Sequence, residues 1–233
     1  MAIKEKNKLS SDIEFSFACA EKSSFPWADQ EVAFVGRSNV GKSTLINSIV
    51  GKKICFTSKM PGRTVTINFF AVDVAKRKFI VDLPGYGFSK SPKEMRDKWQ
   101  ALMPDYLQRG NNGSLKMIYV LVDSRIGLGV VDFDMIEMLS ANGCNFSVVF
   151  TKIDKLKQKE VDELVNFWGA YIDETDARHA SFRAEIAEHK HNVNKQNIAP
   201  KSVYFVCNKA LHIGGGGSIK SLSVDMTNIL NPK

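Results

Sequence analysis

The sequence has little of what marks secreted, disulfide-stabilised or membrane-spanning proteins. Its 233 residues include only four cysteines, widely separated and without a C-x-x-C pair: Cys19, Cys55, Cys144 and Cys207. Free thiols in a reducing compartment are therefore expected, and a zinc centre or a disulfide framework is not. No apolar run approaches the roughly 20 residues that a transmembrane helix needs, so no contact with a membrane interior is expected.

The first residues also lack the pattern of a signal peptide. Residues 1–8 are rich in charge, include an acidic side chain and have no apolar segment behind them. Secretory signals need an apolar core, and organelle transit peptides are rich in arginine and poor in acids. We therefore expect a cytoplasmic protein.

Histidine is scarce as well. The chain has four histidines, three of which lie in a charged stretch predicted to be helical over about 158–192. No complete set of metal ligands is identifiable around His179, His189 and His191, so exposed helix faces are the favoured interpretation of this stretch.

Positive charge, by contrast, is in excess. The formal net charge is +7 and the sequence pI is about 9.2, which favours an anionic partner, nucleic acid first and a membrane surface second. A mildly basic composition without any binding role remains an equally good explanation. The hydrophobic content of 44% is enough for one sizeable core.

The most informative stretch matches the phosphate-binding pattern G-x-x-x-x-G-K-[ST] without a mismatch. Its residues are Gly36, Arg37, Ser38, Asn39, Val40, Gly41, Lys42 and Ser43. An apolar strand is predicted before it, at 31–35, and a helix after it, at 44–50. This context argues against a chance match in a surface loop. Glycines and the helix N-terminus supply backbone N–H groups to phosphate oxygens, Lys42 would reach the β- and γ-phosphates, and Ser43 would bind Mg²⁺.

A second motif, D-x-x-G, follows the predicted strand 78–82. It consists of Asp82, Leu83, Pro84 and Gly85. A carboxylate at this strand tip is placed to hold Mg²⁺ through a water, and the Gly85 N–H can bond a γ-phosphate. The motif is weak alone but strong downstream of a phosphate loop.

A third motif follows the predicted strand 146–150. It consists of Thr151, Lys152, Ile153 and Asp154. A carboxylate here can accept hydrogen bonds from the N1–H and N2–H₂ donors of guanine, which adenine lacks, and Lys152 would lie over the base and brace the phosphate loop. The alternatives are an ordinary Lys-Asp turn, or an ATP-dependent enzyme, against which Asp154 argues.

The order of elements predicts an α/β fold. Further strands are expected at 67–74, 116–123 and 201–206, and helices at about 93–109, 131–141 and 218–230. Strands that alternate with helices, with one antiparallel hairpin at 67–82, give a mostly parallel six-stranded sheet with helices on both faces. Residues 1–30 are expected to form an arm packed on the domain, and 31–233 a single domain with an unusually long segment at about 169–200.

The loop 52–66 is expected to supply a second hydroxyl ligand to Mg²⁺ when a γ-phosphate is bound. Thr57, Thr64 and Thr66 compete for this role on the sequence alone.

Taken together, these stretches resemble the EngB (YihA/YsxC-like) family of small GTPases. The resemblance is carried by GRSNVGKSTLIN at 36–47, TSKMPGRTVTINFF at 57–70, VDLPGYGFSK at 81–90 and TKIDKL at 151–156. It implies GTP and GDP binding, slow hydrolysis and a role in assembly of the large ribosomal subunit, with that subunit or its precursor (rRNA and ribosomal proteins) as partner. It selects Thr64, beside Gly62 and Arg63, as the hydroxyl ligand, so that Ser43, Thr64 and Asp82 would serve Mg²⁺. We expect a monomer.

The sequence departs from the family at the end of the last strand. The resemblance places a guanine contact at Val206, Cys207 and Asn208, where the family usually has Ser-Ser or Ser-Ala. Backbone N–H contacts survive such a change, so the contact is retained as an expectation.

The residue after D-x-x-G is Tyr86, where Ras-like GTPases have the glutamine that orients the attacking water. The remaining catalytic candidates are Lys42, Thr64, Gly85 and Asn39. Some related GTPases with Asn at the position of Asn39 use it to help bind K⁺, so the resemblance implies that hydrolysis is stimulated by K⁺ or by the ribosomal particle. Alternatively, Asn39 only stabilises its loop by a hydrogen bond. Negligible turnover, and hence a nucleotide-dependent RNA or protein adaptor, is the alternative function.

Overall fold

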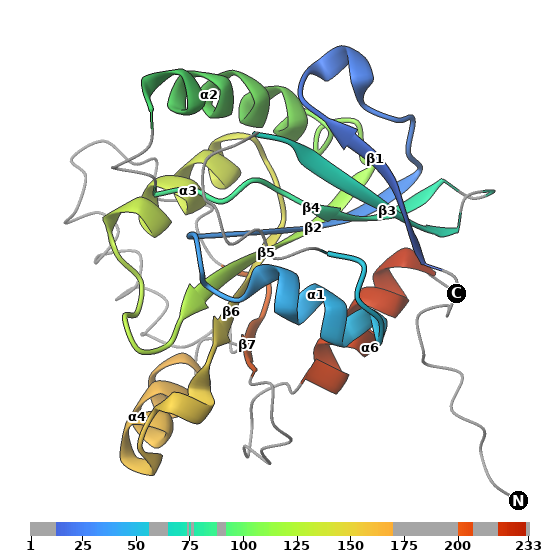
Figure 1. The fold of residues 1–233 in the computed structure, drawn as a ribbon. Coiled ribbons are helices and arrows are strands. Elements are labelled where there is room, and N and C mark those ends of the chain that lie inside the picture. The colour runs from blue at the N-terminus through green and yellow to red at the C-terminus, as the bar shows by residue number, and fades with distance from the viewer. Residues whose placement is uncertain are drawn as a thin grey trace, which may run out of the picture.

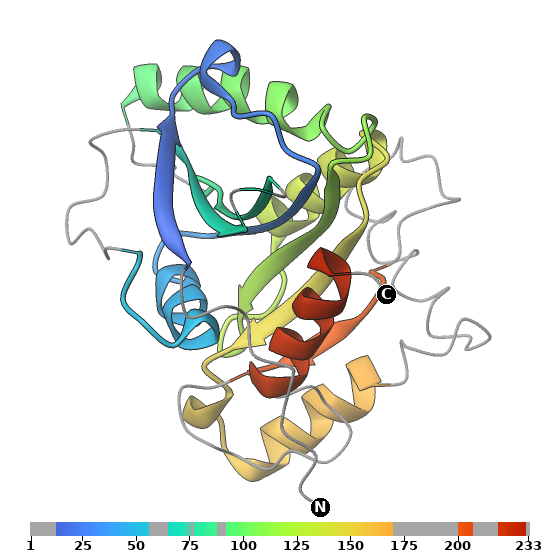
Figure 2. The ribbon, with the colours of Figure 1, turned by 90° about the vertical axis from the view of Figure 1, so that its right-hand side faces the viewer.

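The structure is a computed structural model that describes residues 13–55, 65–73, 75, 77–87, 92–169, 200–206 and 219–231. Its architecture is a central sheet with helices on both faces (Figures 1 and 2). The α/β class and the mostly parallel sheet predicted from the sequence are confirmed.

The sheet has seven strands in the spatial order β1-β3-β4-β2-β5-β6-β7. In chain order these are β1 (Glu14–Cys19), β2 (Gln30–Gly36), β3 (Ile67–Asp73), β4 (Lys78–Asp82), β5 (Leu115–Asp123), β6 (Phe146–Thr151) and β7 (Val203–Phe205). The β3–β4 hairpin is antiparallel, as predicted, and the five strands β4, β2, β5, β6 and β7 run parallel to one another.

The prediction of six strands is wrong by one. The additional strand, β1, comes from the segment expected to be an arm, and it pairs antiparallel with β3 at the sheet edge. Phe15 of β1 packs edge-on against Phe70, with ring centroids 5.8 Å apart, although Phe15 is 55% exposed. Because most of β1 is exposed, its residues lack the pattern of a buried strand.

The helices are α1 (Lys42–Val50), α2 (Lys93–Leu107), α3 (Val130–Ala141), α4 (Gln158–Gly169) and α6 (Ile219–Leu230), with short 3₁₀ turns η1 (Lys22–Ser24) and η2 (Ile153–Lys155). Helices α1 and α6 cover one face of the sheet, and α2 and α3 cover the other (Figure 1). The predicted helix at 158–192 is described only to Gly169, and its continuation lies outside the described residues.

The side chains of β2 divide between two hydrophobic cores. Val32 and Phe34 face the core beneath α1 and α6, whereas Ala33 and Val35 face the core beneath α2 and α3. Alternate residues of a strand point to opposite faces of a sheet, so a strand buried on both faces reads as a continuous apolar run. This burial fixes the register of the central strands and therefore where each of them ends.

The carboxyl ends of the parallel strands meet at one edge of the sheet. There β2 ends at Gly36, β4 at Asp82, β5 at Asp123 and β6 at Thr151. In open α/β sheets, ligands bind outside the carboxyl ends of the strands. All three sequence motifs begin at this edge.

The described residues bear on two expectations that were drawn from the composition, although Cys207 lies outside them. Cys19, Cys55 and Cys144 are buried free thiols. Within the described ranges, no helix is both long and apolar enough to cross a membrane.

Candidate functional site

The phosphate loop joins β2 to α1 and depends on glycine at both ends. A Cβ at Gly36 would lie 2.9 Å from the Leu121 carbonyl oxygen, so only glycine lets β2 approach β5 this closely. Gly41 caps α1 with a φ of 105°, a left-handed conformation that glycine adopts without steric cost. The loop therefore turns sharply and delivers the N-terminus of α1 to the sheet edge.

Lys42 and Asp82 bring the first two motifs into contact. The ammonium of Lys42, the first residue of α1, forms an ion pair with the Asp82 carboxylate at the end of β4. Their side chains are only 14% and 10% exposed, so little water screens the pair. Ser43 follows Lys42 in the first turn of α1 and is half-buried.

The oxygen donors at this point suit Mg²⁺. Ser43 supplies a hydroxyl and Asp82 a carboxylate, and Mg²⁺ prefers oxygen ligands, often one or two from protein with phosphate and water completing the shell. The chemistry of these two side chains therefore fits the ion that the sequence motifs imply.

The loop after β4 extends the sheet edge toward the phosphate loop. The N–H of Leu83 donates to the Phe34 carbonyl at 2.9 Å, and the N–H of Tyr86 donates to the Gly36 carbonyl at 3.3 Å. Pro84 and Gly85 between them are half-buried. The backbone of the D-x-x-G motif is thus held along β2, directly beside the phosphate loop.

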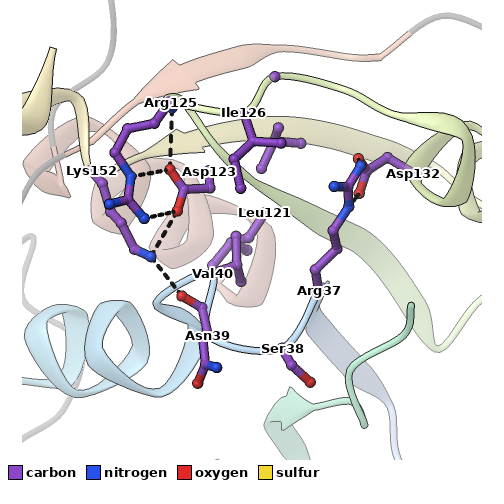
Figure 3. A pocket seen from close by; sticks show the side chains of 12 residues that line it. Arg37, Ser38, Asn39, Val40, Leu121, Asp123, Arg125, Ile126, Asp132 and Lys152 are labelled. Carbon is purple, nitrogen blue, oxygen red and sulfur yellow. Dashed lines mark hydrogen bonds and ion pairs between the residues drawn. The ribbon is translucent and has the colours of Figure 1, made fainter. Parts of the chain in front are cut away.

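The third motif reaches the phosphate loop from β6. The Thr151 hydroxyl donates to the Val40 carbonyl at 2.7 Å. The Lys152 ammonium donates to the Asn39 carbonyl at 2.6 Å and to Asp123 at 2.8 Å (Figure 3). Lys152 has a left-handed φ of 59°, which turns the chain from β6 into η2.

Asp123, the last residue of β5, binds the Lys152 ammonium that contacts the phosphate loop. Its carboxylate accepts hydrogen bonds from Arg125 and Lys152, and these two cations, Arg125 first, hold the pKa of Asp123 well below its usual range. Asp123 is therefore ionised at neutral pH and fixes the Lys152 side chain against the loop. Sequence reasoning did not single out Asp123 as a site residue, although a carboxylate at a strand end was the available signal.

Asp154 lies in η2, two residues after Lys152. Ile153 is buried and anchors the turn, while the side chain of Asp154 is 12% exposed and pairs with Lys155 at 3.5 Å. The carboxylate is therefore held by a turn that begins at the same sheet edge as the phosphate loop.

Several predicted site residues lie outside the described residues: Gly62, Arg63, Thr64, Cys207 and Asn208, together with the competing Thr57. Val206, the first residue of the last predicted contact, is described. It is buried, and its N–H donates to the Phe150 carbonyl at 2.8 Å, which places the end of β7 beside β6 at the same edge.

A small cavity adjoins the phosphate loop (Figure 3). It has a volume of about 150 Å³ and lies between that loop and the segment from β5 to α3, where Arg37 faces Asp132. Ser38 and Asn39 point away from Asp123, and both are exposed. The sequence did not identify Asp132 as the partner of Arg37, because nothing near Asp132 forms a recognisable motif.

The Thr151→Val variant is expected to lower the free energy of unfolding by about 1–2 kcal/mol, since it leaves the buried Val40 carbonyl without its hydroxyl donor. Urea unfolding followed by circular dichroism measures the loss. Thr227→Val is the matched control, because it removes a hydroxyl bond to Ser223 within α6 that contributes little. Equal losses in both variants would contradict a special role for the Thr151 contact.

The chain is similar in sequence to a family model and to curated proteins that all describe GTP-binding proteins. A family model described as a 50S ribosome-binding GTPase matches residues 31–152. The probable GTP-binding protein EngB of Mycoplasmopsis synoviae is 41% identical over 170 residues, which cover 71% of this chain and 89% of that protein. The probable GTP-binding protein EngB of Aquifex aeolicus is 42% identical over 149 residues, covering 64% and 80%.

Solved structures share the fold at lower identity. Toc33 from Arabidopsis thaliana, in complex with GDP and Mg²⁺, has a TM-score of 0.55 and 15% identity, covering 88% of this chain and 85% of that one. Era, in complex with MgGDPNP and nucleotides of 16S ribosomal RNA, has a TM-score of 0.53 and 20% identity, covering 88% and 57%.

Proposed function

The chain belongs to the EngB family of GTP-binding proteins, and from that premise we propose that it binds GTP and GDP, hydrolyses GTP slowly and acts as a nucleotide-dependent switch in assembly of the large ribosomal subunit. The observation that carries the proposal is the position of Lys152. Its ammonium joins the T-K-x-D motif to the phosphate loop through the Asn39 carbonyl. One ligand that carries both a base and a polyphosphate can therefore span the two motifs.

The phosphates would be bound by the loop from Gly36 to Ser43. Backbone N–H groups at the start of α1 favour anions, and Lys42 supplies a full positive charge there. Ser43 and Asp82 would hold Mg²⁺, with Thr64 as the proposed further ligand. The ion would neutralise charge on the phosphates, while the Gly85 N–H would meet the γ-phosphate.

Slow hydrolysis is proposed because no glutamine follows D-x-x-G. Tyr86 is buried and its hydroxyl donates to Asp132 at 2.8 Å, so its side chain is committed to the protein interior. Asn39 is exposed on the phosphate loop, and its proposed role is to help bind K⁺, with a loop-stabilising hydrogen bond as the alternative. Because the buried Tyr86 side chain is bonded to Asp132, it equally supports the second candidate function, an adaptor with negligible turnover.

Phosphate release under single-turnover conditions separates these possibilities. Faster release in K⁺ than in equal Na⁺ supports the switch with a catalytic cation. The same measurable rate in both salts would remove K⁺ from the proposal, and no release in either salt would favour the adaptor.

The proposed partner is the large ribosomal subunit or its precursor, contacted through rRNA and ribosomal proteins. The net charge of +7 supports an anionic partner of this kind. We also propose a cytoplasmic monomer in which residues 31–233 form one GTPase domain, with the long segment at about 169–200 as an elaboration of it.

Guanine recognition is tested with fluorescent GDP and ADP on the wild type and on Asp154→Ala. The wild type is expected to bind GDP and not ADP, and the variant to lose most of its preference for GDP, because an unpaired base edge costs about 1–3 kcal/mol. Asp162→Ala, which removes an exposed carboxylate on α4, is the control. Equal binding of GDP and ADP by the wild type would reject the proposed function.

A further inference from the structure

Three residues from separate parts of the chain meet between the phosphate loop and α3. Arg37 is the second residue of the phosphate loop, Tyr86 directly follows Gly85, and Asp132 lies in the first turn of α3. The Nε of Arg37 donates to the Asp132 carboxylate at 3.1 Å, a second Arg37 nitrogen pairs with the same carboxylate, and the Tyr86 hydroxyl donates to it at 2.8 Å. We name this cluster the Arg37–Asp132–Tyr86 latch.

Asp132 is built into its place. Asp132 is 0% exposed, and its second oxygen also accepts the Gly129 N–H at 2.9 Å at the N-terminus of α3. A Cβ at position 129 would collide with the Arg37 guanidinium, so the small residue there leaves room for the contact. A buried carboxylate with this many donors defines one geometry for the side chains around it.

Tyr86 is held equally firmly. It is 5% exposed, and burial, together with the charge of Asp132, raises its pKa well above the usual value, so the hydroxyl stays a donor throughout the working pH range. Its backbone forms a parallel bridge to Arg37, and Trp99 of α2 donates to the Pro84 carbonyl at 3.3 Å. The loop from Pro84 to Tyr86 is therefore fastened on both sides of Gly85.

We propose that the Arg37–Asp132–Tyr86 latch positions the Gly85 N–H for the γ-phosphate, so that Arg37, Asp132 and Tyr86 are positioning residues for GTP rather than catalytic residues. The proposal rests on the function proposed above and deepens it. A loop already ordered before binding loses less conformational entropy when the ligand arrives. Since only GTP has a γ-phosphate, the latch favours GTP and leaves GDP affinity unchanged.

The test is the ratio of GDP to GTP-analogue affinity. Dissociation constants for GDP and for a non-hydrolysable GTP analogue are measured in the presence of Mg²⁺, for the wild type and for Tyr86→Phe. The variant is expected to bind the analogue about three- to tenfold more weakly, the effect of one lost hydrogen bond, with GDP affinity unchanged. Tyr119→Phe is the matched control, because the Tyr119 hydroxyl also donates to a carboxylate at 2.8 Å. That carboxylate belongs to Asp225 on α6, away from the carboxyl ends of the strands.

A purely structural role would lower stability in both phenylalanine variants and move the ratio in neither, which would overturn the proposal. An equal loss of GDP and analogue affinity in Tyr86→Phe would overturn it too. Failure of the wild type to bind either nucleotide would reject the proposed function as well as the latch. If Tyr86→Phe does not fold, Arg37→Gln, at a half-buried position, is expected to shift the ratio in the same direction, and an unchanged ratio there would also overturn the latch.

Discussion

The Lys42→Met variant is expected to bind GTP and GDP at least about thirtyfold more weakly than the wild type, because removing one partner of a buried charged contact costs about 2–5 kcal/mol. The substitution keeps the apolar stem and removes the ammonium that now pairs with Asp82. Without it, phosphates would meet an uncompensated Asp82 carboxylate that is itself only 7% exposed. Fluorescence titration with labelled GDP and a GTP analogue measures the change.

Lys98→Met is the control for this variant, since it removes a lysine from the exposed surface of α2 and lowers the net charge by the same amount. It is expected to bind both nucleotides like the wild type. Affinity for GDP within threefold of the wild type in Lys42→Met would show that the phosphate loop does not bind phosphate in the proposed way.

The Arg109→Ala variant is expected to lose about 3–5 kcal/mol of unfolding free energy, the cost of leaving a buried charge unpaired. Glu31, at the start of β2, is 0% exposed and accepts the Arg109 Nε at 2.8 Å and the Tyr106 hydroxyl at 3.0 Å. Arg109 also donates to the Pro26 carbonyl at 2.8 Å. Denaturant unfolding measures the loss. The Glu31–Arg109 pair lies at the start of β2, and the proposed nucleotide site lies at its end.

The exposed pair of Arg77 and Asp29 provides the matched control. Their side chains are 52% and 46% exposed, so Arg77→Ala should cost no more than about 1 kcal/mol. A loss in Arg109→Ala no larger than in Arg77→Ala would contradict a role for the buried pair in stability.

The loss in Arg109→Ala should also depend on pH. Burial raises the pKa of Glu31, and Arg109 opposes that rise, so the variant raises the pKa further. A carboxyl whose pKa is higher in the folded than in the unfolded chain lowers stability as the pH rises above its unfolded value of about 4.3. The deficit of the variant should therefore be smaller near pH 4 than near pH 8.

The local motifs could be predicted from the sequence because their geometry depends on near neighbours. Gly36 and Gly41 shape the phosphate loop, and the apolar runs of β2, β5 and β6 fix where each strand ends. The hairpin, the strands β2 to β7 and the helices α1, α2, α3 and α6 lie within a few residues of their predicted bounds for the same reason, whereas the end of the helix predicted at 158–192 lies outside the described residues. The edge strand β1 escaped prediction because pairing with β3, and not its own burial, makes it a strand.

The sequence by itself therefore determined the fold class, the order of the three motifs and the placement of each motif at the end of a strand. Only the tertiary structure decided which side chains hold those motifs together. The Asp123–Lys152 contact and the Arg37–Asp132–Tyr86 latch join residues from different elements, and nothing in the sequence around Asp123 or Asp132 identifies the partners of either carboxylate. Long-range ion pairs depend on how the strands pair and on how the helices pack on the sheet, and no short stretch of sequence specifies either arrangement.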